Sequence, residues 1–293
     1  MTTTATLSDW VTGARVRTLP AAVAPVVVAS ALAAAMGSFY PVRALLALIV
    51  LLALQVGVNY ANDYSDGIRG TDARRVGPTR LVASGLVPAT TVKRAAFACF
   101  GIGVAAGLVL LIISRAWIYL PVGAMMPVLA WFYTGGKRPY GYRGFGEVAV
   151  LVAFGLVPVT GTVYTQVGRL DGPTWALAFA MGLLAAALLV ANNLRDIPTD
   201  REHGKVTLAV RLGDATTRRL YVAMVLVAYL LLIPVVWAYP WALLGLLSLP
   251  LAVAPVRAVL SGQRGRDLVP VLAGTTTLEL GYALLVSAGL VLS

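Results

Sequence analysis

The stretch "NYANDYSDGIRGTD" at residues 59–72 ends a run of almost unbroken Leu, Ala and Val, and this change from apolar to polar residues decides the fold. The apolar run over 42–64 has about the length that a helix needs to cross the hydrocarbon core of a bilayer. Eight further runs of similar length occur, at 18–39, 92–113, 117–135, 146–167, 174–195, 217–238, 240–260 and 268–292. The sequence therefore predicts an all-α integral membrane protein, a single domain over 1–293 built as a bundle of nine transmembrane helices.

Composition supports a membrane protein. Hydrophobic residues make up 59% of the chain and charged residues 12%, and the mean hydropathy of +0.84 is outside the usual range of soluble domains. The sequence lacks the short segments of alternating polarity that mark an outer-membrane β-barrel. The single cysteine, Cys99, lies within an apolar run and cannot form an intrachain disulfide.

The net charge of +11 is distributed in alternate loops. This pattern is typical of membrane topology and does not indicate a nucleic-acid partner. With the N-terminus in the cytoplasm, every Lys and Arg falls on the cytoplasmic side except Arg43, Arg115 and Arg169. Nine crossings then put the C-terminus outside. The two long polar segments, 65–91 and 196–216, both lie on the cytoplasmic side, so we expect a site that faces the cytoplasm from the plasma membrane.

The first polar cluster lies at the cytoplasmic end of the second predicted helix. Its side chains recur three, four and seven residues apart, which places them on one helix face. They are Asn59, Asn62, Asp63 and Asp66. Asp72 follows after a short turn that contains two glycines. Carboxylates at the edge of the hydrocarbon repel one another and are costly to bury without a partner, so these acids are candidates for function.

The sixth predicted helix ends on a matching cluster, "NNLRDIPTDREHGK" at 192–205. Asn192, Asp196 and Asp200 follow one another at intervals of four residues, although a bend at Pro198 could take Asp200 out of register. Carboxylate and amide oxygens suit a hard cation such as Mg²⁺, which binds few carboxylates together with waters and phosphate oxygens. The two clusters therefore predict a magnesium site.

Basic residues accompany both clusters in greater number than salt bridges require: Arg80, Lys137, Arg138, Arg195, Arg201 and Lys205. Acids and bases together predict a diphosphate bridged to the protein by metal ions. The alternative is that the acids cap helix ends and the bases are topology signals that contact lipid phosphates. Two clusters with matched spacing, on helices that run in the same direction, favour the diphosphate site.

These residues carry a resemblance to the UbiA superfamily of membrane prenyltransferases, which has an NDxxDxxxD motif on its second helix and a DxxxD motif on its sixth. "NDYSD" at 62–66 matches the start of the first motif, and Asp196 with Asp200 matches the second. This chain has Gly70 where the family has a third aspartate and places Asp72 two residues later. Within the superfamily, the flanking stretches are most similar to the branch that prenylates 1,4-dihydroxy-2-naphthoate: "RTLPAAVAPV" at 17–26, "GPTR" at 77–80, "GYRGFGE" at 141–147 and "NNLRDIPTDREHGKVTLAVRLG" at 192–213.

The resemblance implies transfer of a polyprenyl chain from polyprenyl diphosphate to 1,4-dihydroxy-2-naphthoate. Diphosphate and CO2 would leave, giving demethylmenaquinol in menaquinone biosynthesis. It also implies Mg²⁺ as cofactor, with two ions bridging the diphosphate. Positive charge on the leaving diphosphate would lower the barrier to an allylic cation. No covalent nucleophile is required, and the sequence offers no Ser–His–Asp or Cys–His arrangement.

Roles for individual residues follow from these motifs. The expected metal ligands are Asp63, Asp66, Asp196 and Asp200, with Asp72 as an additional candidate. The diphosphate is expected to contact Arg80, Lys137, Arg138, Arg201 and Lys205, with support from Asn62 and Asn192. The ring faces of Tyr133, Tyr140 and Tyr142 are candidates to stabilise the cation, although aromatic residues near a membrane interface are more often lipid anchors. Arg143 is a candidate for the acceptor's carboxylate.

Three alternatives have weaker support. "DYSDG" matches the start of the CDP-alcohol phosphatidyltransferase motif, but the continuation "IRGTDARR" does not. An ion-coupled transporter would place its carboxylates near the middle of the bilayer, whereas these clusters lie at one face. Within the superfamily, 4-hydroxybenzoate and homogentisate are alternative acceptors, and only the resemblance separates them from the naphthoate.

Overall fold

The computed structural model of the protein describes residues 5–70 and 80–293, and all regular structure in these residues is helical. The first part of the chain forms α1 (Leu7–Gly13), α2 (Pro20–Ala35), α3 (Pro41–Arg69), α4 (Ala89–Ser114), α5 (Leu120–Phe132), α6 (Gly146–Leu151) and α7 (Val157–Val167). The second part forms α8 (Gly172–Glu202), α9 (Leu208–Leu230), α10 (Leu232–Ala238), α11 (Leu249–Leu260) and α12 (Val269–Leu292). Short 3₁₀ segments are η1 (Val16–Thr18), η2 (Trp117–Tyr119), η3 (Tyr140–Arg143), η5 (Pro240–Ser248) and η6 (Gly265–Leu268), and the π-helical segment η4 (Val152–Leu156) joins α6 to α7.

The expected all-helical membrane fold is confirmed. Seven helical stretches among the described residues are long and apolar enough to cross a membrane. Two shorter apolar stretches, Pro20–Ala35 and Trp117–Phe132, lie where the first and fourth spans are predicted. The first is shorter than the predicted 18–39 because Gly37 takes a left-handed conformation, with φ of 84°, directly after the last helical turn.

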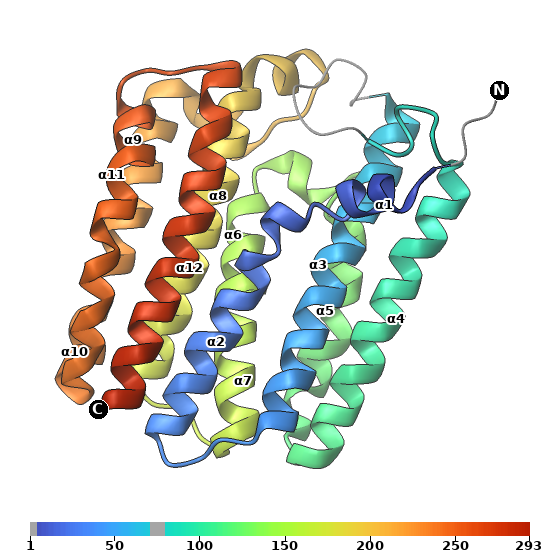
Figure 1. The fold of residues 1–293 in the computed structure, drawn as a ribbon. Helices are drawn as coiled ribbons and strands as arrows, with labels where there is room; N and C mark the ends of the chain where they lie inside the picture. The colour runs from blue at the N-terminus through green and yellow to red at the C-terminus, as the bar shows by residue number, and fades with distance from the viewer. Residues whose placement is uncertain (1–4, 71–79) are drawn as a thin grey trace.

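The helices form a bundle whose long axes run in roughly the same direction (Figure 1). Helix α2 packs against α12 and α7, α3 packs against α4, and α8 packs against α9. The ends of α3 and α8 that carry the acidic residues both lie at the upper end of the bundle in Figure 1, and α1 lies near the upper part of α3. The C-terminus lies at the opposite end.

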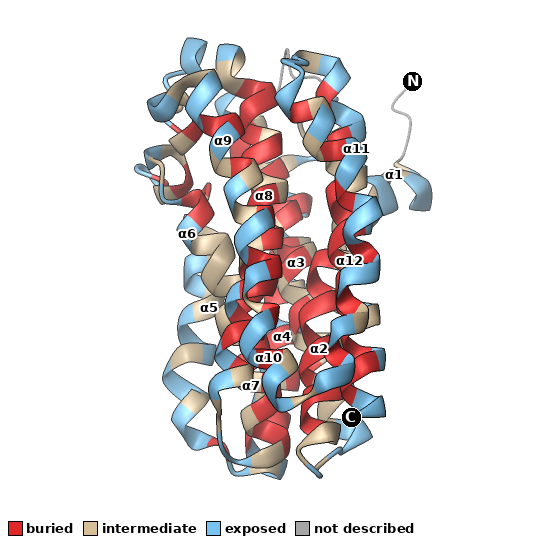
Figure 2. Cartoon of the chain, turned by 90° about the vertical axis from the view of Figure 1, so that its left-hand side faces the viewer, coloured by how far each residue is buried: buried red, intermediate tan, exposed pale blue. Residues whose placement is uncertain are grey.

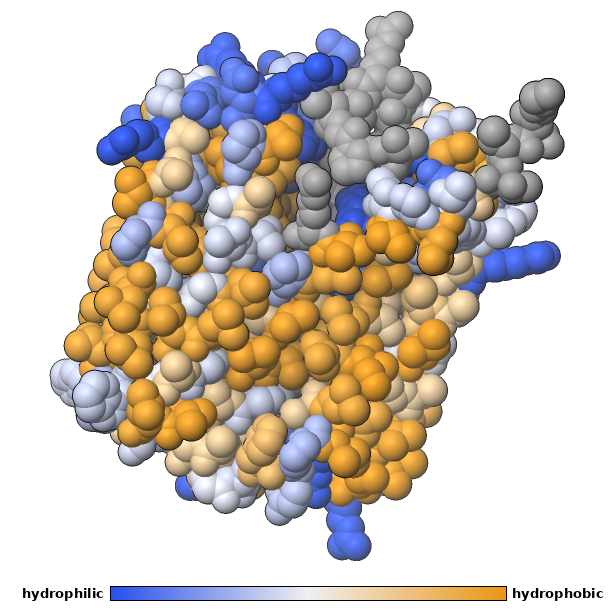
Figure 3. All heavy atoms as spheres, in the orientation of Figure 1, coloured by the Kyte–Doolittle hydropathy of each residue, from blue (hydrophilic) through white to orange (hydrophobic). Residues whose placement is uncertain are grey.

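Buried residues run through the middle of the bundle, and the outward faces of the helices are exposed (Figure 2). The largest buried cluster joins side chains of α2, α7, α8, α9 and α12. Many large apolar residues are nevertheless exposed, among them Trp237, Ile118 and Leu247. Hydrophobic residues dominate the middle and lower surface in Figure 3, while hydrophilic residues gather at the upper end. A surface of this kind is suited to lipid, so the protein is an integral membrane protein.

Both acidic clusters lie on helix that continues past its apolar part. Helix α3 extends to Arg69 and is ended by Gly70, whose φ is 72°. Helix α8 continues through Pro198 to Glu202, so Asp196 and Asp200 lie on the same helix one turn apart. The bend that Pro198 could have introduced therefore does not remove Asp200 from the helix.

Candidate functional site

Hydrogen bonds join the end of α3 to the loop between α5 and η3 and to η3 itself. The Asn62 side-chain oxygen accepts a hydrogen bond from the Thr134 hydroxyl at 2.7 Å. The Asp66 carboxylate accepts one from the Tyr142 hydroxyl, and the Arg69 guanidinium donates to the Thr134 backbone carbonyl. Asn62 and Asp66 are both buried, and their four-residue spacing presents them on one face of α3.

The end of α8 carries its acids beside basic partners. Asp196 forms a two-pronged ion pair with Arg195, with both N–O distances at 2.6 Å. Arg195 also donates to the Asn192 side-chain oxygen at 2.9 Å. Asp200 lies 3.5 Å from the Lys205 ammonium, which follows in the loop to α9. Asp196 and Asp200 are buried, so their charges depend on these partners.

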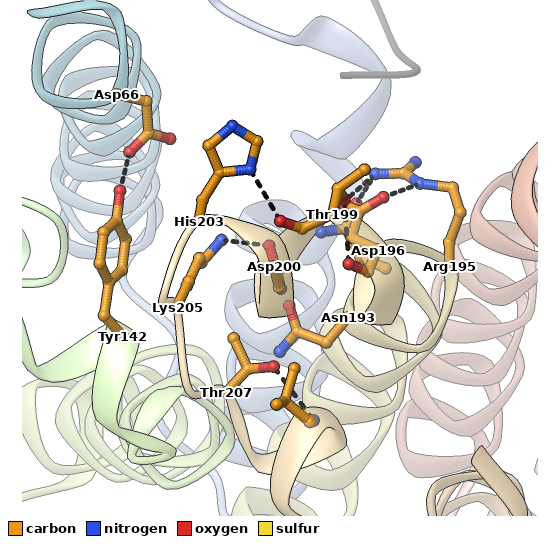
Figure 4. A network of polar contacts seen from close by, with 12 residues as sticks. Asp66, Tyr142, Asn193, Arg195, Asp196, Thr199, Asp200, His203, Lys205 and Thr207 are labelled. Carbon is orange, nitrogen blue, oxygen red and sulfur yellow. Dashed lines mark hydrogen bonds and ion pairs between the residues drawn. The ribbon is translucent and has the colours of Figure 1, made fainter. Parts of the chain in front are cut away.

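Tyr142 and Lys205 connect the two helix ends. The Lys205 ammonium lies 5.2 Å from the centre of the Tyr142 ring, within the range of a cation–π contact. The backbone N–H of Val206 donates to the Tyr142 carbonyl at 3.0 Å. A continuous path of contacts therefore runs from Asp66 through Tyr142 and Lys205 to Asp200 (Figure 4). The two acidic clusters, 130 residues apart along the chain, belong to one polar network.

The donor set suits a hard cation. Among residues 5–70 and 80–293, no three His, Cys, Asp or Glu side chains lie close enough to form a metal cluster by themselves. Magnesium needs few carboxylates, because waters and phosphate oxygens complete its coordination. Asp66 on α3 and Asp196 and Asp200 on α8 supply carboxylates from two sides of one network, which fits an ion shared with a diphosphate. Asp72 lies outside the described residues.

Asp63 makes different contacts from those expected of a metal ligand. Its two carboxylate oxygens accept hydrogen bonds from the backbone N–H groups of Leu81 and Val82, each at 2.9 Å. The residue is fully buried. The structure therefore joins Asp63 to the segment that leads into α4, and not to the path between Asp66 and Asp200.

The basic residues of the predicted site fall into two groups. Lys137, Arg138 and Arg143 line an open cavity of about 370 Å³ together with Tyr142 and a residue that sequence reasoning missed, Arg211. The four basic side chains of this cavity are exposed, and so is that of Arg201. Arg80 is half-buried at the start of the segment held by Asp63. The cavity adjoins the acidic network through Tyr142, which belongs to both.

Tyr133 and Tyr140 lie edge to face, with ring centres 5.6 Å apart. The Tyr140 hydroxyl donates to the Leu129 carbonyl at 2.8 Å. Burial raises the pKa of Tyr140 to about 12. The Tyr140 phenol therefore keeps its proton at neutral pH. Of the three predicted tyrosines, Tyr142 donates a hydrogen bond to an acidic side chain of the site, that of Asp66.

Sequence reasoning also missed several supporting residues. Arg69 and Thr134 hold the end of α3 to the α5–η3 loop. Asn193, the neighbour of the predicted Asn192, donates to the buried Glu147 at 2.9 Å. Arg69 could have been found, because it lies three residues after Asp66 and hence on nearly the same helix face. Thr134 carries no local signal of this kind.

Comparison with known proteins identifies the family of the chain. The model of the UbiA prenyltransferase family matches residues 22–289. The chain belongs to the UbiA prenyltransferase family. A 1,4-dihydroxy-2-naphthoate octaprenyltransferase from Mycobacterium tuberculosis is 52% identical, over 98% of this chain and 98% of the relative. The enzyme of the same name from Escherichia coli is 38% identical, over 97% of this chain and 95% of the relative.

Solved structures of UbiA homologues share the fold. One from Aeropyrum pernix, without ligand, superposes with a TM-score of 0.70 at 19% identity, covering 92% of this chain and 97% of the homologue. One from Archaeoglobus fulgidus, bound to DMAPP and Mg²⁺, superposes with a TM-score of 0.60 at 13% identity, covering 96% of this chain and 99% of the homologue. At such identities the likeness concerns the architecture.

Proposed function

We propose that this UbiA family member transfers a polyprenyl chain from polyprenyl diphosphate to 1,4-dihydroxy-2-naphthoate. Diphosphate and CO2 are released, and demethylmenaquinol is formed for menaquinone biosynthesis. The observation that carries the proposal is the path from Asp66 through Tyr142 and Lys205 to Asp200, which joins two acidic helix ends into one network. The naphthoate acceptor is supported by the near full-length relatives of that name.

The network provides for both parts of a metal diphosphate. Asp66, Asp196 and Asp200 would hold Mg²⁺, with Asn62 and Asn192 orienting the neighbouring groups. Bound Mg²⁺ supplies positive charge to the leaving diphosphate. A UbiA homologue bound to DMAPP and Mg²⁺ supports this cofactor, and we propose two ions that bridge the diphosphate.

Basic side chains would bind the diphosphate oxygens that the metal leaves unneutralised. Lys205 lies 3.5 Å from Asp200 and would exchange that contact for a phosphate. Arg80, Lys137, Arg138 and Arg201 would complete the anion site. The Tyr142 ring, already in contact with the Lys205 cation, would face the allylic cation when diphosphate leaves. Arg143, in the adjoining basic cavity, would bind the naphthoate carboxylate.

The site would face the cytoplasm from the plasma membrane. We propose nine crossings with the N-terminus inside, because the basic loops then lie on one side. Polyprenyl diphosphate would enter from the bilayer with its tail among the apolar helices. Hydrophilic residues gather at the upper end of the bundle (Figure 3), where α3 and α8 have their acidic ends (Figure 1), and this end suits a charged headgroup.

The test uses purified protein in detergent with labelled polyprenyl diphosphate and a panel of aromatic acids. We expect transfer to 1,4-dihydroxy-2-naphthoate, loss of transfer when EDTA removes divalent ions, and recovery on adding Mg²⁺. Transfer to 4-hydroxybenzoate or homogentisate alone would contradict the proposed acceptor. Transfer that survives EDTA would contradict the proposed cofactor.

A further inference from the structure

The end of α3 has two adjoining faces, and the side chains on each make contacts with a different part of the chain. Asn62 and Asp66, four residues apart, contact Thr134 and Tyr142 in the polar network. Asp63 and Gly67, also four residues apart, share the next face. This second face is covered by the turn that begins at Arg80, and it takes no part in the contacts between the acidic clusters.

The Asp63 side chain fixes this turn by accepting hydrogen bonds from the backbone of the turn. Its Oδ2 accepts from Leu81 N–H and its Oδ1 from Val82 N–H, each at 2.9 Å. Two successive amides aimed at one carboxylate make a strong, charge-assisted arrangement. The turn is closed by its own hydrogen bonds from Ser84 N–H to the Arg80 carbonyl at 3.1 Å and from Val87 N–H to the Leu81 carbonyl at 3.1 Å.

The same turn packs closely against α3 on one side and against α1 on the other. A Cβ on Gly67 would lie 2.5 Å from Val82 Cγ1, so only glycine lets the turn approach α3 so closely. A Cβ on Gly13 in α1 would lie 2.8 Å from Leu81 Cδ1, and Leu81 is 1% exposed. Asp63 itself is 0% exposed, so a hydrated ion could reach its oxygens only if the turn moved away.

We propose that Asp63 is a positioning residue and not a metal ligand. By fixing the two amides that follow Arg80, it orients that arginine toward the diphosphate. This inference rests on the proposed function, in which Arg80 binds the diphosphate. The first motif is thereby divided: Asn62 and Asp66 serve the metal diphosphate, while Asp63 and Gly67 hold the turn.

The experiment compares Asp63→Asn with Asp66→Asn. Asparagine keeps the shape of Asp63, but its NH2 group cannot accept from the second amide, so the turn loosens. Two readouts are kinetic: the KM for polyprenyl diphosphate and the Mg²⁺ concentration that gives half-maximal rate. A third needs no activity. It is the rate at which maleimide labels Val87→Cys, a buried position at the end of the turn, in a Cys99→Ser background.

For Asp63→Asn we expect both the KM for the diphosphate and the labelling rate at position 87 to rise about tenfold, as for loss of a hydrogen bond to a charged group. The Mg²⁺ requirement should stay within about twofold of the parent, because no ligand is lost. For Asp66→Asn we expect unchanged labelling and a severe loss of metal-dependent turnover. A raised Mg²⁺ requirement in Asp63→Asn with unchanged labelling would overturn the inference. An unchanged Mg²⁺ requirement together with unchanged labelling would overturn it as well.

Gly67→Ala provides a second variant should Asp63→Asn not fold. Its Cβ meets Val82 without altering any charge, so we expect faster labelling and a higher diphosphate KM with an unchanged Mg²⁺ requirement. Wild-type labelling of this variant would overturn the inference. If the parent protein transfers no prenyl group to the naphthoate, the proposed function fails, whereas the labelling comparison still decides whether Asp63 holds the turn.

Discussion

Tyr142 is the residue on which the site depends most directly, because its hydroxyl and its ring have separate partners. The hydroxyl donates to Asp66, and the ring faces the Lys205 ammonium. Tyr142→Phe removes the first contact and keeps the second. We expect kcat/KM to fall about tenfold, the loss typical of a hydrogen bond to a charged group.

Tyr221→Phe is the matched control for Tyr142→Phe. Its hydroxyl bonds to Thr275 at 2.7 Å in the core, away from the acidic network. This variant should lose some thermal stability but keep its activity per folded molecule. If Tyr142→Phe behaves in the same way, the Tyr142–Asp66 hydrogen bond has no role in turnover.

Asp66→Asn tests the carboxylate itself. The asparagine oxygen can still accept from Tyr142, so the fold is preserved while the charge is lost. We expect turnover to fall about 10²- to 10³-fold, the size of effect seen when a group that stabilises transition-state charge is removed. Steady-state rates with folded protein, verified by gel filtration, provide the measurement.

The exposed Asp267 on the same side of the proposed membrane topology is the control. Asp267→Asn removes one negative charge from the cytoplasmic face without touching the network, and its turnover should equal the parent's. Equal turnover in Asp66→Asn and Asp267→Asn would mean that Asp66 holds no essential ion.

The sequence could predict the contacts of a residue only when its partner lies nearby along the chain. The four-residue spacing of Asn62 and Asp66 is visible in the sequence, and the structure places both on one face. Their partners Thr134 and Tyr142 are 72 and 76 residues away, and helix periodicity contains no information about such pairs. The role of Asp63 was hidden for the same reason: its spacing resembles that of a ligand, while its contacts are to backbone amides.

At the scale of elements, apolar run length predicted where helices occur, because each run must satisfy its backbone hydrogen bonds inside the bilayer. It predicted their ends less well. The second and sixth spans continue beyond 64 and 195, to Arg69 and Glu202. Within these extensions Asp66 and Asp200 are buried and contact Tyr142 and Lys205. The π-helical segment Val152–Leu156 was not foreseen either, because it depends on packing against α8.

That packing gives a prediction about α8. A Cβ on Gly182 would lie 2.6 Å from the Leu151 carbonyl oxygen, and one on Gly155 would lie 2.4 Å from the Ala178 carbonyl oxygen. The two helices touch backbone to backbone, which small residues permit in membrane bundles. Gly182→Ala should therefore lower the free energy of unfolding by about 1–3 kcal/mol, the usual cost of overpacking.

Gly101→Ala on α4 is the control, because a Cβ there meets nothing within 4 Å. Alanine favours helix over glycine by up to about 1 kcal/mol, so this variant should be as stable as the parent or slightly more stable. Thermal unfolding in detergent measures both variants. Equal midpoints for Gly182→Ala and Gly101→Ala would show that the α6–α8 region can separate without cost.

At the scale of the whole molecule, the distribution of charge predicts how the bundle lies in the membrane. The basic loops and the acidic helix ends share the upper end of the bundle, and the C-terminus lies at the other (Figure 1). Lys and Arg near the ends of spans are retained on the cytoplasmic side during insertion. We therefore expect position 83 to face the cytoplasm and Ser293 to face outside.

Single cysteines at these two positions, in the Cys99→Ser background, test this orientation. A maleimide that cannot cross the membrane should label Ser293→Cys on intact cells but label Ala83→Cys only after permeabilisation. The reverse result would mean that the bundle is inverted, which would place the diphosphate site outside, away from a cytoplasmic supply of substrate. Labelling of both positions from one side would mean an even number of crossings between them. Since α4 to α12 provide seven apolar stretches between these positions when Trp117–Phe132 is counted, such a result would require one of them not to cross.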